Sequence, residues 1–392
     1  MQRAKPTRNE RFERFILRLI QHEGADQGQP RSIRFLLWIF KQFSCVFTAI
    51  TVTRAWLYET GMFHRFPLGC QVISVGNVTV GGTGKTPVVE ILAKTLTEEG
   101  RKVAILSRGY RKKEKPLLQR IFNPQTTPPR VVSDGKRVLL DSELSGDEPF
   151  MLANNLPGVV VLVDKDRVKS GRYAIRHFGC DVLILDDGFQ YMRLKHTHEI
   201  VLVDKTNPFG NGHLLPRGIL REPARNIRRA DFIFITKSDG DSDALRMQLR
   251  KMNPTAEIME CRHRPCYYKN AYSDQVIPLE KIRGMKVVSL AGIAAPMSFE
   301  NSIRHMGGLL LSCERFSDHY RYRPKDILDV INAADDIGAE AILTTEKDAV
   351  RLPRLERPKV PVYYMRMDIE IIKGFDNFKE CVSRICFSGK AN

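Results

Sequence analysis

A glycine-rich turn between a short apolar segment and a longer periodic segment limits this chain to few folds. Residues 71–76 are apolar enough for a buried strand, and residues 87–96 repeat apolar side chains at helical spacing. Between them lies Gly81-Gly-Thr-Gly-Lys-Thr86. A strand, a glycine turn and a helix in this order predict a phosphate-binding loop, because backbone N–H groups and the helix N-terminus there surround phosphate oxygens.

The residue types of this loop suggest what each one does. Lys85 is placed to reach the β- and γ-phosphates, and the Thr86 hydroxyl to hold Mg²⁺. The usual pattern has glycine where this chain has Thr79, and Val80 excludes the variant loop with a second lysine at that position. The alternative is a turn that only packs a helix on a strand, which leaves Lys-Thr at the helix start unexplained. The predicted nucleotide-binding residues are Thr79, Val80, Gly81, Gly82, Thr83, Gly84, Lys85 and Thr86.

A second apolar strand, residues 181–186, ends in the carboxylates Asp186 and Asp187. Carboxylates at the carboxyl end of a parallel strand beside a phosphate loop hold Mg²⁺ and its waters. One member of the pair can instead cap the following turn. The sequence therefore favours the pair as metal ligands without choosing between them.

The remaining apolar segments alternate with helical ones, which is typical of an α/β fold. We expect a P-loop NTPase-like, doubly wound parallel sheet with strands at 102–107, 159–164, 200–204 and 232–236 and a helix at 165–178. A second, smaller α/β lobe follows, with strands at 286–290, 341–345 and 360–365 and helices near 298–305 and 324–334. The boundary falls in a polar, irregular stretch around residues 255–280.

The N-terminal part is basic and apolar in turn. Residues 12–20 predict a basic amphipathic helix, suited either to a membrane surface or to packing on its own protein. Phe35–Thr53 is nearly all apolar but contains Lys41, which favours a helix lying in the membrane interface over a single span. No secretory signal is evident, so the folded part is expected on the cytoplasmic face. The net charge of +17 (62 basic and 45 acidic residues) favours an anionic partner.

Eight cysteines are scattered along the 392 residues, unlike a disulfide framework, and are expected to be reduced thiols. Cys261 with Cys266, and Cys381 with Cys386, have a loose spacing that a zinc site could use. The alternative is a set of small buried side chains.

A phosphate loop does not say how the nucleotide is used. Thr236-Lys-Ser-Asp239 after a strand is similar to the element by which GTPases read guanine, so a membrane-associated P-loop GTPase is one possibility. A kinase that phosphorylates a hydroxyl is the other, because Asp147 and Glu148 follow a glycine turn and supply a base and a metal ligand. A basic nucleic-acid-binding NTPase ranks below both, since no RNA- or DNA-binding motif accompanies the charge.

Each kinase residue also has a structural alternative. Asp147 suits the N-terminal cap of a helix starting near Pro149. His319 can orient a carboxylate or be structural. Arg221 suits a transferring phosphate or a solvated surface pair.

Taken together, the motifs carry a resemblance that covers residues 70 to 350. The chain resembles the tetraacyldisaccharide 4′-kinases, the lipid A 4′-kinases of bacteria with an outer membrane. The matching segments, in order, are Val75-Gly-Asn-Val-Thr-Val-Gly-Gly-Thr-Gly-Lys-Thr-Pro87, Ser107-Arg-Gly-Tyr110, Gly146-Asp-Glu-Pro149, Asp186-Asp-Gly-Phe-Gln190, Gly210-Asn-Gly-His-Leu-Leu-Pro216, Leu220-Arg-Glu-Pro223, Ala291-Gly-Ile-Ala294, Phe316-Ser-Asp-His319 and Thr345-Glu-Lys-Asp-Ala349.

The resemblance implies ATP-dependent phosphorylation, with Mg²⁺, of the 4′-hydroxyl of a lipid A disaccharide 1-phosphate at the cytoplasmic face of the inner membrane. It implies four segments: membrane-associated helices at 1–66, a nucleotide-binding domain at 67–255, a small β linker at 256–280 and a C-terminal lobe at 281–392. It makes the anionic membrane surface a partner, with no nucleic acid and no obligate protein partner. Carried over by position, the implied residues are Asp147 as base with His319 as its partner, Lys85 and Arg221 at the phosphates, Thr86, Glu148, Asp186 and Asp187 at the metal, and Arg108 and Gln190 near the substrate.

This chain departs from the family pattern at several positions. Tyr191 and Tyr320 stand where the family usually has histidine, and Arg217 and Ile219 where it usually has a small residue and a proline. Arg111-Lys-Lys113 replaces a usual glycine after the Arg-Gly-Tyr segment. These changes concern substrate contacts more than the chemistry.

Overall fold

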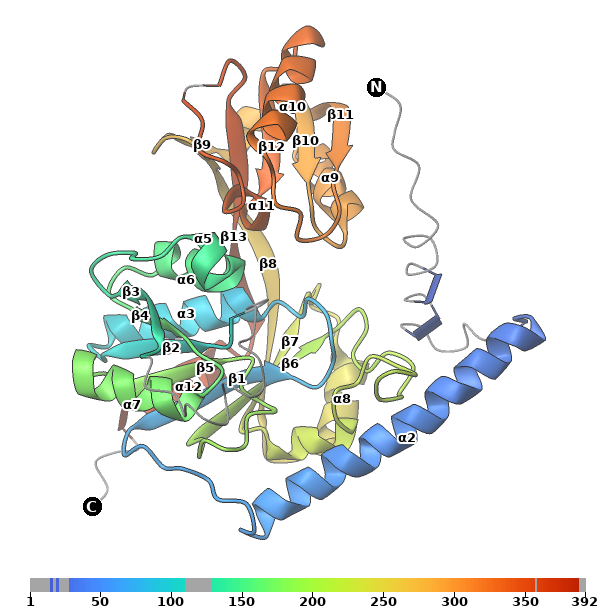
Figure 1. Cartoon of the computed structure of the whole chain (residues 1–392), viewed down its shortest axis with the longest axis vertical. Coiled ribbons are helices and arrows are strands. Elements are labelled where there is room, and N and C mark those ends of the chain that lie inside the picture. The colour runs from blue at the N-terminus through green and yellow to red at the C-terminus, as the bar shows by residue number, and fades with distance from the viewer. Residues whose placement is uncertain (1–14, 17–18, 21–27, 110–127, 357, 388–392) are drawn as a thin grey trace, which may run out of the picture. The chain divides into compact units, whose positions relative to one another are not determined.

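A computed structural model describes residues 15–16, 19–20, 28–109, 128–356 and 358–387 of the chain (Figure 1). It divides into two compact units. Unit 1 comprises Met1–Leu106, Asp166–Arg262 and Ile371–Asn392, and unit 2 comprises Ser107–Lys165 and His263–Glu370. Two long strands, β8 and β13, contribute residues to both units.

Unit 1 is built on a parallel sheet with the strand order β2-β5-β1-β6-β7-β8. The strands are β1 (Gln71–Asn77), β2 (Val103–Ser107), β5 (Val182–Asp186), β6 (His198–Asp204), β7 (Phe232–Thr236) and β8 (Glu257–Asn270). Apart from β8, they are largely buried runs rich in Val, Ile and Leu, as expected for strands covered on both faces. The expected parallel α/β sheet is therefore confirmed.

Besides an N-terminal helix, the helices of unit 1 are α3 (Lys85–Glu98), α7 (Arg167–Phe178), the 3₁₀ helix η1 (Ala224–Arg229), α8 (Asp243–Met252) and α12 (Phe375–Phe387). The Asp166 carboxylate caps α7 by accepting from the backbone N–H groups of Val168 and Lys169, so the helix predicted from residue 165 starts at Arg167. On one face of the sheet, alternate residues of β6 and β7 form a core with Leu245 and Leu249 of α8. Neither α8 nor α12 was among the predicted helices.

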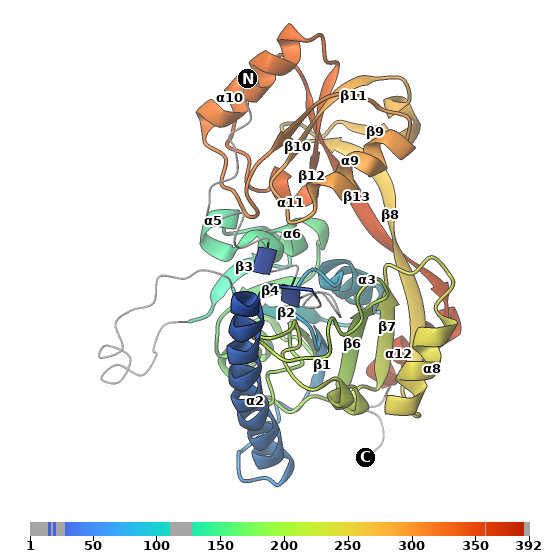
Figure 2. The same ribbon diagram turned by 90° about the vertical axis from the view of Figure 1, so that its right-hand side faces the viewer.

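Helix α2 (Arg31–Glu59) lies along unit 1 and contains the apolar run predicted at 35–53 (Figures 1 and 2). Phe47 packs against the core of the unit, the Ser44 hydroxyl donates to the Leu214 carbonyl at 2.8 Å, and Arg54 donates to the Gln190 carbonyl at 2.6 Å. The apolar side chains of this helix that are more than half exposed are Phe35, Trp38, Phe43, Val46, Ile50 and Trp56. By length and composition this helix is able to cross a membrane. Most of the predicted amphipathic helix at 12–20 lies outside the described residues.

Unit 2 contains a sheet with the order β11-β10-β12-β13-β8, and β9 pairs with β8. Its strands are β9 (Val276–Pro278), β10 (Lys286–Ala291), β11 (Leu309–Arg315), β12 (Ala341–Thr345) and β13 (Val362–Lys373), and β3 (Arg130–Asp134) pairs antiparallel with β4 (Val160–Val163). Its helices are α5 (Ser142–Ser145), α6 (Asp147–Asn155), the 3₁₀ helix η2 (Leu279–Ile282), α9 (Pro296–His305), α10 (Pro324–Asp336) and α11 (Glu346–Ala349). Alternate side chains of β10 and β12 pack on α10 on one face and on α9 on the other.

The stretch around residues 255–280, predicted to be irregular, is mostly the 14-residue strand β8. Arg262, Arg264 and Cys266 are exposed at alternate positions, so the polar composition reflects one solvated face of a strand. Residues 107–165 group with unit 2, because Ser142 and Asp147 hydrogen-bond to residues near 320 and 350. The predicted four-segment division, with 67–255 as one domain, stays a prediction.

We expect Gly76→Ala to lower the free energy of unfolding by about 1–3 kcal/mol, the usual cost of overpacking. A Cβ at this position would lie 2.6 Å from the Phe189 Cβ and 2.8 Å from the Phe189 backbone nitrogen. Urea unfolding without nucleotide measures the loss. Gly82→Ala, where a Cβ meets no atom within 4 Å, is the matched control. Equal stability of the two variants would contradict this packing.

Candidate functional site

The predicted phosphate loop lies between β1 and α3 in unit 1. Gly84 precedes α3 with φ 79°, and Gly81 has φ 114°, backbone values that a side-chain-bearing residue rarely adopts. A neighbouring segment braces the loop, since the Val80 N–H donates to the Ile219 carbonyl and the Arg221 N–H to the Val78 carbonyl, both at 2.8 Å. Thr236 of β7 donates to the Thr83 carbonyl at 2.8 Å. The glycines therefore turn in a backbone that is fixed on two sides.

Lys85, Asp187 and Arg221 form the charged centre of this unit. Lys85 Nζ lies 3.3 Å from Asp187 Oδ1, and Arg221 Nη1 lies 2.8 and 2.7 Å from the two Asp187 oxygens. Burial raises the pKa of Asp187, but the charges of Lys85 and Arg221 outweigh it, so the pKa is lowered from 3.8. The carboxylate is therefore ionised at neutral pH and holds both cations beside the phosphate loop.

Two residues that sequence reasoning missed support this centre. Asn77, the last residue of β1, accepts from Lys85 Nζ at 3.2 Å through its side-chain oxygen. Glu222 is buried and accepts from Gln190 Nε2 at 2.7 Å. Gln190 Nε2 also donates to the Asn77 carbonyl at 3.0 Å, and Arg221 Nη1 lies 3.4 Å from Gln190 Oε1. Both ends of the Gln190 amide thus contact protein atoms. The signal for Glu222 was its place beside Arg221 in the Leu-Arg-Glu-Pro segment.

The predicted metal ligands divide between the units. Thr86 and Asp186 are both buried in unit 1, at the start of α3 and the end of β5. Glu148 belongs to unit 2, where it lies 2.9 Å from Lys347 Nζ. Among the described residues, no group of three or more His, Cys, Asp or Glu could hold a metal ion by itself. A cation bound by these oxygens would therefore need ligands from elsewhere, such as nucleotide phosphates.

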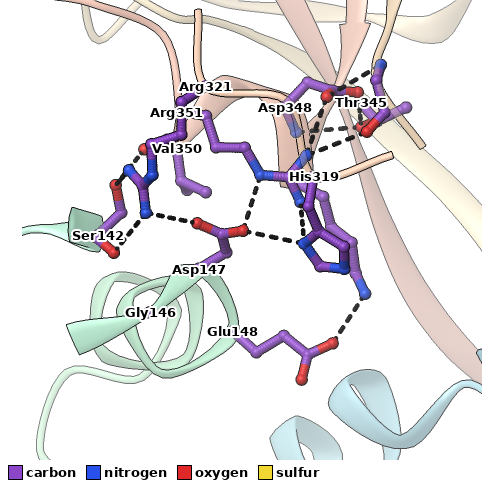
Figure 3. A network of polar contacts seen from close by, with 12 residues as sticks. Ser142, Gly146, Asp147, Glu148, His319, Arg321, Thr345, Asp348, Val350 and Arg351 are labelled. Atoms are coloured by element: carbon purple, nitrogen blue, oxygen red, sulfur yellow. Dashed lines mark hydrogen bonds and ion pairs between the residues drawn. The ribbon is translucent and has the colours of Figure 1, made fainter. Parts of the chain in front are cut away.

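Unit 2 gathers the predicted acid–base pair (Figure 3). Asp147 is the first residue of α6, after Gly146 with φ 96°. Its Oδ2 lies 3.3 Å from His319 Nδ1, so the structure brings the two predicted residues together. His319 has φ 59°, and its N–H donates to the Gly292 carbonyl at 3.1 Å.

Two arginines that the sequence did not single out also contact Asp147 (Figure 3). Arg351 Nε donates to Asp147 Oδ2 at 2.7 Å, and Arg321 Nη2 donates to Oδ1 at 3.2 Å. Burial raises the pKa of Asp147, but the contacts with His319, Arg351 and Arg321 outweigh it, so the pKa is lowered from 3.8. The carboxylate is ionised at neutral pH and able to accept a hydrogen bond from a hydroxyl.

Arg351 is held in turn by Asp348, whose side chain is 0% exposed. Arg351 Nη1 lies 3.3 Å from Asp348 Oδ1, and Asp348 accepts from Tyr322 at 2.9 Å and from Thr345 at 2.7 Å. Burial is the main reason that the pKa of Asp348 is raised. Asp348 lies within the Thr-Glu-Lys-Asp-Ala segment and Arg351 just beyond it, so the segment was visible in the sequence but its buried ion pair was not.

Of the remaining residues, Arg108 is exposed in unit 2. Tyr191 and Tyr320, where the chain departs from the family pattern, have structural partners. The Tyr191 hydroxyl lies 3.3 Å from Asp166 Oδ1 and 3.1 Å from the Arg167 nitrogen, and the Tyr320 hydroxyl donates to Asp326 at 3.0 Å. Residues 111–113 lie outside the described part of the chain.

The charged residues of the guanine-type element Thr236–Asp239 form ion pairs with other residues of unit 1. Lys237 Nζ lies 2.5 Å from Asp204 Oδ2. Asp239 pairs with Lys205, and its side chain is 74% exposed. Both charged members of the element are thus in ion pairs within unit 1.

The eight cysteines are all free thiols, of which Cys261 and Cys381 are buried and Cys266 is exposed. Burial raises the pKa of the Cys261 thiol to about 12. Burial of this kind is typical of a small packed side chain.

A parallel sheet with a glycine loop opening a helix at Lys-Thr, and carboxylates ending the neighbouring strand, defines a P-loop nucleotide-binding protein. A model of the family "Tetraacyldisaccharide-1-P 4′-kinase" matches residues 36–386. Two relatives named tetraacyldisaccharide 4′-kinase are similar over most of the chain. The one from Syntrophus aciditrophicus is 36% identical over 88% of this chain and 92% of its own length, and the one from Halothermothrix orenii is 33% identical over 95% and 98%.

The crystal structure of LpxK from Aquifex aeolicus in complex with ATP superposes with a TM-score of 0.70 at 28% identity, covering 89% of this chain and 99% of that one. The chain belongs to the tetraacyldisaccharide-1-phosphate 4′-kinase family.

We expect Asp239→Ala to leave ATP affinity and the ratio of ATP to GTP affinity within about a factor of two, because an exposed ion pair contributes only about 0–1 kcal/mol. Competition between labelled ATP and unlabelled GTP measures both. Lys85→Ala, which removes the loop cation, should weaken nucleotide binding in the same assay. A selective loss of GTP binding in Asp239→Ala would reinstate guanine recognition.

Proposed function

We propose that this chain transfers the γ-phosphate of ATP to the 4′-hydroxyl of a tetraacyldisaccharide 1-phosphate, a step of lipid A biosynthesis. The observation that carries the proposal is the family match across residues 36–386, which takes in the phosphate loop and the cluster around Asp147. The names of the relatives and the ATP in the Aquifex aeolicus structure agree with it.

The nucleotide end of the reaction is assigned to unit 1. Residues 79–86 surround the phosphates with backbone N–H groups, and Lys85 and Arg221 supply positive charge where negative charge builds up on the transferred group. Before ATP binds, Asp187 partly neutralises these two cations at contact distance. Gln190 contributes through its contact with Arg221, since its amide is already bonded to Asn77 and Glu222.

Mg²⁺ is proposed to accompany ATP, with Thr86, Asp186, Asp187 and Glu148 as its candidate protein ligands. Their oxygen atoms suit Mg²⁺, which is commonly held by one or two carboxylates together with nucleotide phosphates. When bound, the ion supplies positive charge that stabilises the leaving phosphate oxygens.

Asp147 is proposed as the base that accepts the proton of the 4′-hydroxyl, with His319 as its partner. The low pKa of Asp147 makes it a weak base, but phosphoryl transfer depends mainly on positioning and charge. An ionised carboxylate held by two arginines is suited to orienting a hydroxyl. Arg108 is proposed to contact the anionic acceptor.

Membrane association is proposed through α2, whose exposed face carries three aromatic and two aliphatic residues besides Phe35. Since its other face packs on unit 1 through Ser44, Phe47 and Arg54, we propose that the helix lies in the interface at the cytoplasmic face of the inner membrane. The anionic lipid surface complements the charge of +17.

We expect the full-length protein to transfer labelled phosphate from ATP to the lipid disaccharide, and Asp147→Asn to lower kcat by about 10²–10⁴-fold, the usual contribution of a general base. The KM for ATP should change little, because ATP is assigned to the other unit. Asp318→Asn, at an exposed carboxylate beside His319, is the control and should retain activity. Absence of transfer by the unmodified protein would reject the function, and full turnover by Asp147→Asn would reject only the base.

We expect Trp38→Ser, Phe43→Ser and Ile50→Ser combined to reduce binding to liposomes containing phosphatidylglycerol, because each removes exposed apolar area that the interface would bury. Co-sedimentation measures the bound fraction. Met247→Ser, at an exposed apolar residue of α8, is the matched control. Undiminished sedimentation of the triple variant would show that the membrane contact lies elsewhere.

A further inference from the structure

A cavity on unit 1, the α7 cavity, is lined mainly by one face of helix α7. Its volume is about 330 Å³, within the range of about 300–1,000 Å³ that is usual for small-molecule sites. Phe66 and Arg193 line it from the segments that precede β1 and β6. None of its described lining residues belongs to the phosphate loop or to the charged centre around Asp187. The proposed reaction therefore leaves this cavity unused.

The lining of the α7 cavity is strongly basic. Its described residues include one carboxylate, Asp166, and four cations, which are Lys169, Arg172, Arg176 and Arg193. Three of the cations lie on α7 at spacings of three and four residues, so like charges are neighbours on one face of the helix. Such pairs repel each other and lower helix stability slightly. An anion bound in the cavity would remove this repulsion.

The carboxylate of the cavity already has partners. Asp166 Oδ1 caps α7 by accepting from two backbone N–H groups of its first turn, at 3.1 and 3.2 Å. Its Oδ2 lies 3.1 Å from Arg193 Nη1. Within the part of the chain that the structure describes, Arg172 and Arg176 have no carboxylate partner. Asp166 therefore balances Arg193 and leaves the positive charge of the α7 face uncompensated.

An aromatic ring orders two of the arginines. The Cζ atoms of Arg172 and Arg193 lie 5.6 and 5.3 Å from the centre of the Phe66 ring. Phe66 is itself fixed, because its N–H donates to the Arg193 carbonyl at 2.9 Å and its carbonyl accepts from the Lys195 N–H at 3.0 Å. A guanidinium stacked on a ring loses part of its freedom before a ligand binds and keeps the N–H groups at its edge available. The cavity thus presents ordered donors.

The number and type of the donors indicate which anion suits the α7 cavity. Guanidinium groups match the oxygen atoms of both phosphate and carboxylate. A phosphate monoester has a second pKa of about 6, so it carries close to two negative charges at neutral pH. Four cations and one carboxylate suit this charge better than the single charge of a carboxylate or a phosphodiester. The volume also leaves room for the group to which the phosphate is esterified.

We infer that the α7 cavity is a second anion site of this chain, which binds a phosphate monoester through Lys169, Arg172 and Arg176. The monoester could come from a soluble phosphorylated metabolite or from the headgroup of a membrane lipid. Phe66 follows Glu59, the last residue of α2, by seven residues, so its Cα lies within about 25 Å of the end of that helix. A lipid phosphate is therefore within reach if α2 lies in the interface. The inference does not depend on the proposed reaction.

The first arm of the test measures binding of glycerol 3-phosphate to the full-length protein by isothermal titration calorimetry. A non-hydrolysable ATP analogue is present at saturation, so that the phosphate loop is not available to the probe. For a soluble ester, we expect the combined Arg172→Gln and Arg176→Gln variant to bind the probe at least about tenfold more weakly than the unmodified protein, because two charge-assisted contacts are lost.

The matched control removes the same charge at two exposed lysines of unit 1, by Lys94→Gln combined with Lys251→Gln. Its affinity for glycerol 3-phosphate should stay within about a factor of two of the unmodified protein, because salt screens distant exposed charges. Binding of ATP by the arginine variant should be unchanged, which verifies that this variant is folded.

The second arm compares phosphatidylcholine vesicles that contain phosphatidic acid with vesicles that contain phosphatidylglycerol, matched in surface potential. Phosphatidic acid presents a monoester and phosphatidylglycerol a diester, so the ratio of the two bound fractions reports recognition of the headgroup rather than of charge alone. For a lipid ligand, we expect the unmodified protein and the lysine variant to prefer phosphatidic acid, and the arginine variant to bind both vesicles alike.

The two arms distinguish the sources of the phosphate. Loss of glycerol 3-phosphate affinity in the arginine variant supports a soluble ester, and a loss confined to the preference for phosphatidic acid supports a lipid headgroup. If the arginine and lysine variants behave alike in both arms, the inference is wrong and the α7 cavity is an ordinary solvated basic face. Neither arm measures phosphate transfer, so a failure of the proposed function would be detected separately.

Discussion

Parallel pairing of β1 with β5 and β6 is the constraint on which unit 1 depends. Val75 pairs with Asp186 and Asn77 with Leu202, so the strands end together at one edge of the sheet. The phosphate loop, Asp186 and Asp187 follow these ends directly. The hydrogen bonds between these strands therefore bring cations and carboxylates from distant parts of the sequence together at the carboxyl-terminal edge of the sheet. The Lys85–Asp187–Arg221 contacts then fix their spacing.

Local patterns in the sequence were enough to predict the loop and most strands of both sheets, but not β3, β8, β9 or β11. Buried parallel strands are continuous apolar runs, and Lys-Thr at the start of a helix is chemically informative. β8 escaped prediction because its solvated alternate residues, such as Arg262 and Arg264, give a polar composition. The start of α6 at Asp147, two residues before the expected start near Pro149, follows from Gly146 and its positive φ.

The candidate site was predictable where its residues lie in short motifs, and not where they act through tertiary contacts. Asp147 and His319 are 172 residues apart, and only the motif pattern suggested that they meet. Arg351 has no motif of its own. Its part arises from burial against Asp348, and burial depends on the whole fold. The same holds for Asn77, which looks like an ordinary strand end until Lys85 is seen to contact it.

Helix α2 donates two hydrogen bonds to backbone carbonyls of unit 1, from Ser44 to Leu214 and from Arg54 to Gln190. Those carbonyls belong to the two loops that lead to Arg221 and away from Asp187. If adsorption of α2 to lipid changes its fit to these loops, linkage requires nucleotide occupancy to change lipid affinity by the same factor. The fraction of protein bound to vesicles, measured with and without ATP, would then report on phosphate binding at the loop, although α2 contacts only the segments that flank it.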